Sequence, residues 1–449
     1  MLEQILQTLK TNNVFLTGGA GVGKSYTTNK IIDFYKQNQK NVAVLASTAL
    51  AANVISGKTV HSFFSLGICT NLDELKAKKS LKNATNLKQI LPKLDLIIID
   101  EISMLSASVC EMIDFRLKQY DYSGKIMLVG DFYQLPPVNK EKDIFANVYA
   151  FESSFWAGLK LVSFELEISK RTNDEYFYNA LKLIRKSNTN ANIVNYLKRF
   201  LKPFDPKDDS FDDYTIICAT NKEVDEINKS KLDKLDEKLL VFSSKLSTKK
   251  DPNQAEQKLI SSWLKGNINY DDLHLKVGAR VIFSTNSSTK DFYNGEQGRI
   301  VDIEDNAIAV LKDNYELVYV KEYEFALSQF ITINDKLEEE IIATLKAYPP
   351  KLAYAITIHK SQGMSIEKLV CKIDRIFENG QFYVAISRAS NPQNLIIYYE
   401  RKFAFNEFLN KIIKKDKLVN DFYKNLNPIK STNWHLQQVT FDDTLNNQS

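Results

Sequence analysis

The sequence predicts an α/β fold in which two parallel-sheet cores follow one another along the chain. Short continuous apolar runs alternate with helical patterns up to about residue 165, and similar runs recur after residue 215. Runs that alternate between apolar and polar residues lie between them, within residues 236–345. Continuous runs are typical of buried parallel strands, and alternation is typical of antiparallel strands. At about 100–200 residues per domain, 449 residues suffice for about three such units.

The first core is predicted over residues 1–65 and 94–165. An apolar stripe formed by Leu2, Ile5, Leu6 and Leu9 predicts an opening helix. A second helix is predicted over residues 27–35. Four apolar runs predict the strands of an open sheet, at residues 14–16, 42–45, 96–99 and 126–129.

A small basic helical insertion, residues 66–93, is predicted to interrupt this core in the manner of a wedge. Between residues 73 and 93 the insertion has six lysines and only two acidic residues. Such a cluster can contact nucleic-acid phosphates, or it can be a solvated lysine-rich face. Charge alone leaves both interpretations open.

The second core is predicted over residues 166–235 and 346–415. Its strands are expected at residues 216–218, 369–371 and 395–397. Alternating runs at residues 280–283, 299–301 and 317–320, with turn residues Asn294, Gly295 and Gly298, predict a small antiparallel β-barrel inserted over residues 236–345. The C-terminal extension, residues 416–449, is expected to be partly flexible, with a mobile tail from Asn425 to which no function is assigned.

Composition excludes several classes of protein. Hydrophobic residues make up 44% and charged residues 25% of the chain, which fits neither a disordered nor a fibrous protein. The four cysteines form no CxxC pair, which argues against a zinc ribbon or a disulfide framework. No signal peptide or apolar run of about 18 residues is evident, so a cytoplasmic protein without a membrane partner is expected. A net charge of +4 does not by itself indicate nucleic-acid binding.

A phosphate-binding loop is predicted at residues 18–25, where GGAGVGKS fits the pattern GxxxxGK[ST] between a strand and a helix. Glycines let backbone N–H groups surround phosphate oxygens, the Lys24 ammonium reaches the β- and γ-phosphates, and Ser25 ligates Mg²⁺. The alternative is a simple tight turn. The predicted ATP-binding residues of this loop are Gly18, Gly19, Ala20, Gly21, Val22, Gly23, Lys24 and Ser25.

Two acids follow the apolar run at residues 96–99. Asp100 is predicted to hold the Mg²⁺ ion together with Ser25, and Glu101 to act as the general base that activates water. The alternative is a pair of acids that cap a helix. Beside a phosphate loop, the pair indicates hydrolysis of ATP rather than simple nucleotide binding.

Further short motifs accompany the phosphate loop and the acid pair along the chain. In order, the motifs are LEQ at residues 2–4, GGAGVGKS at 18–25, STALAA at 47–52, TVHS at 59–62, DEISM at 100–104, GDFYQLPPV at 130–138, KRTND at 170–174, LKVGAR at 275–280, YNG at 293–295, TIHKSQG at 357–363 and GQFYVAISRA at 380–389. With these motifs, the chain resembles the Pif-type (RecD-like) branch of superfamily-one 5′→3′ DNA helicases over residues 1 to about 400. The chain departs from the family pattern at two positions. Ala49 follows Thr48 where the family usually has glycine, and Thr172 follows Arg171 where the family usually has glutamine.

The resemblance implies RecA-like cores and a role for each matching residue. Gln4 would contact adenine, although an exposed polar position is the alternative, and Gln134 would sense the γ-phosphate. Arg171 and Arg388 would stabilise charge on the γ-phosphoryl group, with structural ion pairs as the alternative. Gln362 and Gly363 would complete the ATP site. The implied DNA contacts are Thr48, His61, Phe63, Thr357, His359 and Lys360.

The implied activity is that of an ATP-dependent DNA helicase that moves 5′→3′ on single-stranded DNA and unwinds tailed or forked duplexes. It would use ATP and Mg²⁺, act as a monomer, and lie at the nucleoid if the protein is bacterial. G-quadruplexes and RNA–DNA hybrids are further expected substrates, in replication, recombination or repair. An RNA helicase and a nucleotide-gated DNA-binding protein are the alternatives, because the phosphate-loop and arginine motifs do not distinguish them.

Overall fold

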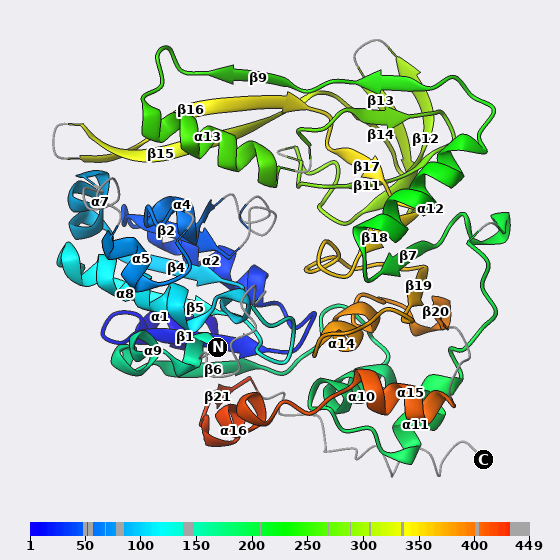
Figure 1. Cartoon of the computed structure of the whole chain (residues 1–449), viewed down its shortest axis with the longest axis horizontal. Coiled ribbons are helices and arrows are strands. Elements are labelled where there is room, and N and C mark those ends of the chain that lie inside the picture. Colours follow the sequence, from blue (N-terminus) through cyan, green and yellow to red (C-terminus); the bar gives the residue numbers. More distant parts are fainter. Residues whose placement is uncertain are drawn as a thin grey trace.

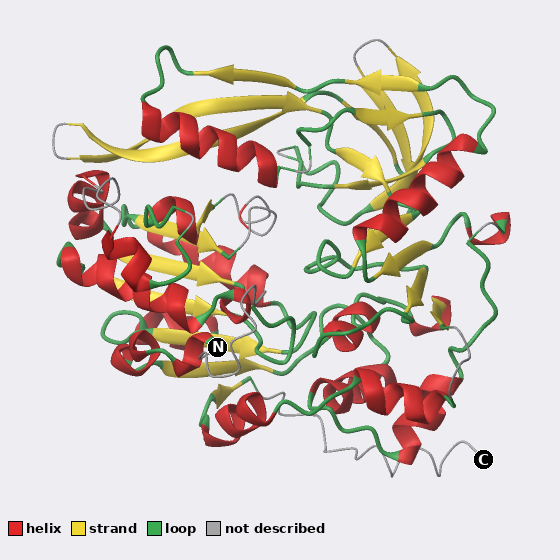
Figure 2. Ribbon diagram, viewed as in Figure 1, coloured by secondary structure: helices red, strands yellow, loops and turns green. Residues whose placement is uncertain are grey.

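The first core is a seven-stranded parallel sheet with helices on both faces (Figures 1 and 2). The computed structural model describes residues 1–47, 52, 57–67, 69–77, 85–137, 148–206, 208–267, 269–287, 289–304, 307–333, 336–399 and 404–431. The sheet has the order β21-β6-β1-β5-β4-β2-β3. Its strands are β1 (Val14–Gly18), β2 (Val42–Ala46), β3 (Lys58–Thr59), β4 (Leu96–Asp100), β5 (Lys125–Val129), β6 (Val162–Leu166) and β21 (Ile429–Lys430).

All four strands predicted for this core are confirmed. Successive residues of β1 face opposite sides of the sheet: Val14 and Leu16 pack in the apolar cluster that contains Ile31 of α2, and Phe15 packs with Met112 of α8. Both faces are therefore covered, which is why the runs are continuously apolar. The helices of the core are α1 (Leu2–Thr8), α2 (Lys24–Gln37), α4 (Val60–Phe63), α8 (Ala107–Gln119) and α9 (Ser154–Leu159), with the short turns η2 (Ile102–Met104) and η3 (Ala150–Glu152).

The predicted helical insertion is present in its described residues. It contains α5 (Leu72–Ala77), α7 (Thr85–Ile90) and the turn η1 (Leu91–Lys93). Leu75 and Leu87 are buried in the same apolar cluster as α8. The insertion is therefore anchored to the first core by an apolar face.

The second core is a four-stranded parallel sheet with the order β18-β7-β19-β20, and its three predicted strands are confirmed. Its strands are β7 (Thr215–Cys218), β18 (Ala355–Thr357), β19 (Leu369–Lys372) and β20 (Leu395–Tyr398). Its helices are α10 (Glu175–Arg185), α11 (Ala191–Lys198), α12 (Asn221–Asp233), α14 (Gln381–Ile386) and α15 (Phe405–Ile412), with the turns η4 (Asp209–Phe211) and η5 (Pro392–Asn394).

The inserted β-rich segment forms open antiparallel sheets, and its described residues contain no closed barrel. One sheet has the order β14-β13-β12-β11-β17, the second β15-β16-β9, and β8 pairs with β10. The barrel prediction fails because the inserted strands divide between separate sheets. The long strands β15 and β16 pair with each other and with β9, and they form a hairpin that reaches over the first core (Figure 1). The elements are β8 (Leu240–Phe242), β9 (Lys245–Thr248), α13 (Gln254–Gly266), β10 (Leu273–Leu275), β11 (Arg280–Phe283), β12 (Gln297–Glu304), β13 (Ala307–Lys312), β14 (Leu317–Val320), β15 (Tyr323–Ile333), β16 (Lys336–Ala347) and β17 (Pro350–Leu352).

The C-terminal extension returns from the second core to the first. Helix α16 (Lys417–Asn425) packs beneath the first core, and β21 pairs in parallel with β6 at the edge of its sheet (Figure 1). The prediction of a mobile tail from Asn425 is thus wrong for residues 425–431. A two-residue strand at a sheet edge has too few residues to produce a periodic apolar pattern. The tail beyond residue 431 lies outside the described residues.

Candidate active site

The phosphate loop, residues 18–25, joins β1 to α2 as predicted. Gly21 and Gly23 have φ of 72° and 91°, in the left-handed region that favours glycine. A side chain at Gly18 would place its Cβ only 2.4 Å from the carbonyl oxygen of Leu166. The Lys24 ammonium donates hydrogen bonds to the carbonyls of Gly18 and Gly19, at 2.8 and 2.9 Å. Burial lowers the pKa of Lys24 below its ordinary value.

The predicted acid pair stands at the end of β4, the strand two places from β1 in the sheet. The Glu101 N–H donates to Asp100 Oδ1 at 2.8 Å, and Glu101 itself has a left-handed φ of 51°. Burial, and next the charge of Asp100, raises the pKa of Glu101 to about 7. Burial also raises the pKa of Asp100. A carboxyl group with a pKa near neutrality is suited to proton transfer at physiological pH.

The second core contributes Gln362 and Arg388 beside this acid pair. The Gln362 side-chain amide donates to Glu101 Oε2 at 3.0 Å. Arg388 is 1% exposed, and its guanidinium donates to the carbonyls of Val384 and Ser361 and to the hydroxyl of Ser387. Burial lowers its pKa to about 10, and the charges of Tyr383 and, next, Glu101 oppose this effect. Among the described residues, Arg388 forms no ion pair, and its three hydrogen bonds are to groups of its own core.

Arg171 lies between the phosphate loop and the second core. Its side chain packs against Gly21, where an added Cβ would come within 2.6 Å of Arg171 Cβ. The guanidinium donates to the Ser365 hydroxyl and to the carbonyls of Ser387 and Gly363, at 2.9, 2.8 and 3.1 Å. Gly363, a predicted ATP-site residue, thus accepts a hydrogen bond from Arg171 through its carbonyl. Arg171 joins the two cores in this arrangement.

Sequence reasoning assigned no role to Tyr383, although it lies inside a quoted motif. Its buried hydroxyl, from α14 of the second core, accepts a hydrogen bond from the N–H of Ala20 in the phosphate loop, at 2.8 Å. Burial raises the pKa of Tyr383 to about 12. Only the tertiary structure brings residues 20 and 383 together, so no local spacing could have indicated the contact.

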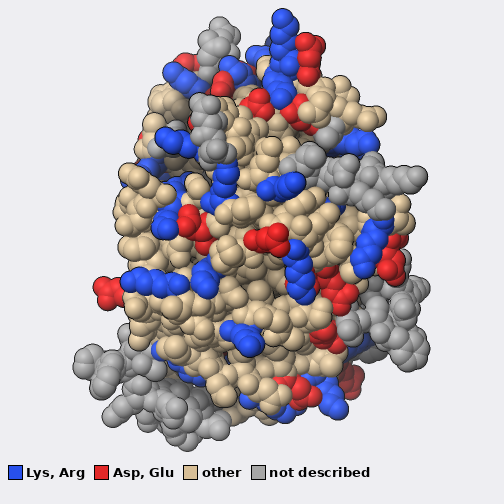
Figure 3. All heavy atoms as spheres, turned by 90° about the vertical axis from the view of Figure 1, so that its left-hand side faces the viewer, with Lys and Arg blue, Asp and Glu red and all other residues tan. Residues whose placement is uncertain are grey.

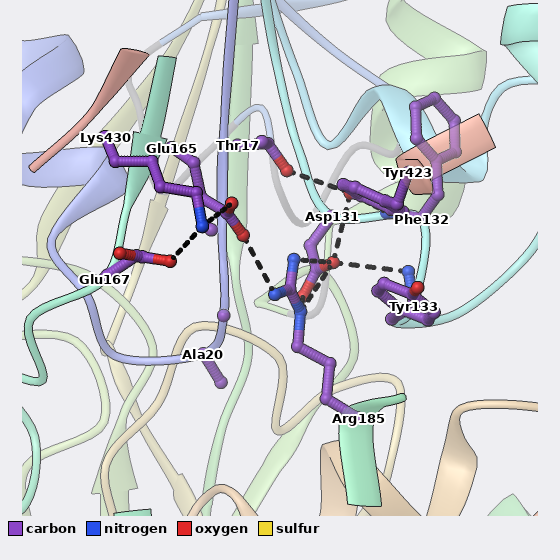
Figure 4. Close-up of polar contacts among 12 residues, drawn as sticks. Thr17, Ala20, Asp131, Phe132, Tyr133, Glu165, Glu167, Arg185, Tyr423 and Lys430 are labelled. Atoms are coloured by element: carbon purple, nitrogen blue, oxygen red, sulfur yellow. Dashed lines mark hydrogen bonds and ion pairs between the residues drawn. The ribbon is translucent and has the colours of Figure 1, made fainter. Parts of the chain in front are cut away.

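Gln134 follows β5 and belongs to a buried polar network. Its side-chain amide donates to Asp131 Oδ2 at 3.3 Å, and Asp131 also accepts from Nε and Nη2 of Arg185, at 3.0 and 2.9 Å (Figure 4). Burial acts to raise the pKa of Asp131, but the charges of Arg185 and Lys24 outweigh it and lower that pKa. Gly380 of the second core packs so closely on Gln134 that an added Cβ would lie 2.2 Å from the Gln134 carbonyl oxygen. Arg185 is a second residue that sequence reasoning missed.

The residues predicted to hold Mg²⁺ offer oxygen ligands at the loop and at β4. Ser25 is exposed at the start of α2, and Asp100 is 7% exposed. Mg²⁺ commonly takes one or two protein oxygens and completes its shell with water and substrate phosphates. A hydroxyl and a carboxylate fit that chemistry. Among the described residues, no three His, Cys, Asp or Glu side chains are grouped to hold a metal without such additional ligands.

The remaining predicted contacts lie on α1 and at or just after the end of β18. Gln4 is exposed on α1. Thr357 is buried, and its hydroxyl accepts the N–H of Lys360 at 3.2 Å, while His359 is half-buried and Lys360 exposed. Thr48 lies outside the described residues.

Phe63, one of the predicted DNA contacts, instead packs with the neighbouring Phe64 in the apolar core. Phe63 is 7% exposed, and its ring packs edge-on against Phe64 and Phe330, 4.9 and 6.1 Å between centroids. Phe64 is fully buried. Both rings belong to the apolar core, so neither offers a face on which a base can stack.

A cavity of about 560 Å³ separates the first core from the hairpin β15–β16. It is lined from the first core by Lys58, Thr59 and His61, and from the insertion by residues that include Trp263 and Glu339. Burial lowers the pKa of His61, so a neutral imidazole is favoured there. The hairpin is held to the first core by the Lys58 ammonium, which lies 3.3 Å from Glu339 Oε1 and 3.6 Å from the centroid of the Phe330 ring.

The surface charge is dispersed on the face that includes the hairpin tip and the helical insertion. Figure 3 shows Lys and Arg spread over this face, with Asp and Glu beside several of them, rather than one continuous basic patch. None of the helices in the described ranges combines the length and apolar character needed to cross a lipid bilayer.

Comparisons with known proteins find relatives along most of this chain. Residues 1–192 match the model of the PIF1-like helicase family. The ATP-dependent DNA helicase Pif1 of Campylobacter jejuni is 44% identical over 438 residues, which cover 95% of this chain and 98% of that protein. The crystal structure of Bacteroides sp. Pif1 with ADP-AlF4 is 26% identical, covers 94% of this chain and 95% of that one, and has a TM-score of 0.79. A Bacteroides Pif1 structure with ADP-AlF3 and single-stranded DNA is 27% identical, covers 94% and 96%, and has a TM-score of 0.63.

Proposed function

The chain belongs to the PIF1-like helicase family, and from that premise we propose that it is an ATP-dependent DNA helicase that moves 5′→3′ along single-stranded DNA and unwinds tailed or forked duplexes. One observation carries the proposal: the acid pair of the first core meets the second core directly, through the 3.0 Å hydrogen bond from Gln362 to Glu101. A site shared by two cores converts a change of ligand into relative motion of those cores.

ATP is the proposed nucleotide substrate, and its phosphates would lie on the loop at residues 18–25. Glu101 would take the proton of the attacking water, since burial brings its pKa to about 7. Lys24 and Arg388 would offset the charge that develops on the γ-phosphoryl group, and Gln134 would contact that group. Mg²⁺, held by Ser25 and Asp100, would neutralise phosphate charge when bound.

Gln4, Arg171, Gln362 and Gly363 remain proposed ATP-site residues. The hydrogen bonds of Arg171 to Gly363, Ser365 and Ser387 favour a role in which it transmits closure between the cores. For Arg171 to contact a phosphate directly, these hydrogen bonds would have to be replaced by hydrogen bonds to the phosphate when ATP binds.

We propose the cavity under the hairpin as part of the route for single-stranded DNA. His61 lines it, and Lys58 supplies a positive charge. Thr48, Thr357, His359 and Lys360 are the other proposed contacts, with hydroxyl and ammonium groups on phosphates rather than on base edges. Such contacts would track DNA without regard to sequence.

The proposed architecture is that of two RecA-like cores in tandem, residues 1–65 with 94–165 and residues 166–235 with 346–415. Residues 66–93 would form the wedge-like insertion, 236–345 the β-rich inserted domain and 416–449 the C-terminal extension. Since one chain contains the phosphate loop, the acid pair and the arginines, we propose that a monomer is the active unit.

The test is ATP-driven strand separation of two duplexes that differ only in carrying a 5′ or a 3′ single-stranded tail, with Lys24→Ala as the control. Unwinding of only the 5′-tailed duplex, lost in the variant, is expected. Preference for the 3′ tail would overturn the polarity, and DNA-stimulated hydrolysis without unwinding would indicate a translocase or a nucleotide-gated clamp. Matched RNA oligonucleotides, G-quadruplexes and RNA–DNA hybrids in the same assay define the substrate range.

A further inference from the structure

The C-terminal helix α16 lies against the loop that follows β5, directly behind the proposed ATP site. Phe422 of this helix stacks on Phe151, 4.4 Å between centroids, and packs edge-on against Phe132, Trp156 and Phe15. Tyr423 stacks on Tyr133, 4.6 Å apart with an interplanar angle of 12°. The helix is thus held by an aromatic cluster of the first core.

The hydroxyl of Tyr423 contacts three residues in two segments of that core (Figure 4). It donates to Asp131 Oδ1 at 3.3 Å, accepts the N–H of Phe132 at 3.2 Å, and lies 2.9 Å from the hydroxyl of Thr17 at the end of β1. Thr17 immediately precedes the phosphate loop, and Asp131 holds the side-chain amide of Gln134. One phenol oxygen therefore connects the phosphate loop to the Gln134 loop.

The same extension touches the link to the second core. Lys430 of β21 forms ion pairs with Glu167 and Glu165, at 2.9 and 3.9 Å, and Glu165 also pairs with Arg185 at 3.2 Å (Figure 4). Arg185 lies at the end of α10 in the second core and holds Asp131 by hydrogen bonds from Nε and Nη2. Asp131 is therefore held from one side by the second core and from the other by the C-terminal helix.

We propose that Tyr423 is a positioning residue for ATP hydrolysis: it fixes Asp131, and through Asp131 the amide of Gln134, relative to the phosphate loop. This inference rests on the proposed function, because it deepens the role given to Gln134. Tyr423 does not contact the reacting atoms in this arrangement. Tyr423 acts by limiting the movement of the Gln134 amide, because a displacement of a catalytic group by about 1 Å is enough to lower the rate of hydrolysis severely.

The experiment compares DNA-stimulated ATP hydrolysis by the full-length wild type, Tyr423→Phe, Gln134→Ala and the double variant. Tyr423→Phe keeps the aromatic ring and its stacking and removes only the hydroxyl. We expect kcat to fall about tenfold with KM for ATP within about twofold, because a hydrogen bond to a charged group is lost. In the Gln134→Ala background, Tyr423→Phe is expected to change kcat less than about twofold.

Tyr149→Phe is the matched control. The Tyr149 hydroxyl donates to Oδ2 of Asp416, the N-cap residue of α16, at 2.5 Å. The Tyr149 ring stacks on Phe151 in the aromatic cluster that holds α16. This variant loses an anchor of α16 without touching Asp131, so kcat is expected to stay within about twofold of the wild type.

Different outcomes contradict different parts of the proposal. An equal fall in kcat for Tyr149→Phe and Tyr423→Phe would overturn the positioning role and leave α16 as a structural support only. If Tyr423→Phe lowers kcat about as much in the Gln134→Ala background as in the wild type, the effect does not pass through Asp131 and Gln134. If Tyr423→Phe alone has the wild-type kcat, both the positioning role and this path are overturned. If the wild type itself shows no DNA-stimulated hydrolysis, the proposed function fails first, whatever the variants do.

Discussion

Glu101 is the residue whose protonation should control the rate near neutral pH. Burial, together with Asp100, raises its pKa to about 7, and a general base acts only when deprotonated. We therefore expect kcat/KM for ATP to fall roughly tenfold per pH unit below about pH 7 and to level off above it. The measurement is the DNA-stimulated ATPase rate at subsaturating ATP between about pH 5.5 and 8.5.

Glu101→Gln is the control for this assignment. It retains the size of the side chain and is expected to lower kcat by about 10²–10⁴ while ATP binding persists. A pH profile without an acidic limb, or a variant that hydrolyses ATP at the wild-type rate, would contradict the assignment of the base.

The residues found from sequence and those missed differ in one physical respect. The residues of the phosphate loop are contiguous in sequence, and so are the two acids at residues 100–101. Each set lies at the end of one strand and in the turn that follows it. Tyr383, Arg185 and Tyr423 act through side chains that meet only when distant segments pack together. Tyrosine occurs 21 times in the chain, so its presence carries little local information.

At the scale of elements, prediction succeeded where burial on both faces makes a strand continuously apolar. Strands β1, β4 and β7 are buried at every residue. The missed β6 has the sequence VSFEL, in which Ser163 and Glu165 interrupt the apolar pattern. Glu165 has a structural role there, because it pairs with Arg185 near the end of the strand.

The ion pair between Lys58 of the first core and Glu339 of the hairpin β15–β16 should affect the affinity for DNA. Lys58 lines the proposed DNA route, and Glu339 neutralises it from the hairpin. We expect Glu339→Gln to tighten binding of single-stranded DNA and Lys58→Ala to weaken it, each by about fivefold or less. Fluorescence anisotropy at several salt concentrations measures both, and Lys58→Ala should reduce the salt slope by about one.

Lys245→Ala controls for net charge in that experiment. Lys245 lies on β9 of the same sheet, is 70% exposed at its side chain and pairs with Glu322 outside the cavity. If it weakens binding as much as Lys58→Ala does, the cavity is not the route of the DNA.

At the scale of the whole molecule, the two cores are joined by a buried ion pair as well as by the chain. Asp131 of the first core is fully buried and Arg185 of the second is 7% exposed. Removing one partner of such a pair leaves an uncompensated charge, which costs about 3–5 kcal/mol, whereas removing both charges costs much less. Arg185→Met should therefore destabilise the protein more than Arg185→Met combined with Asp131→Asn.

The shift of the urea midpoint for the two single variants and the double variant measures this coupling between the cores. Arg185→Met alone should move the midpoint furthest, because Asp131 then loses its ion-pair partner and keeps the charge of Lys24 and hydrogen bonds from groups such as the Tyr133 N–H and the Tyr423 hydroxyl. The double variant should recover much of that loss and at the same time free the cores to move relative to one another. Additive losses in the double variant would mean that the two charges stabilise their own cores separately, and that the pair does not couple them.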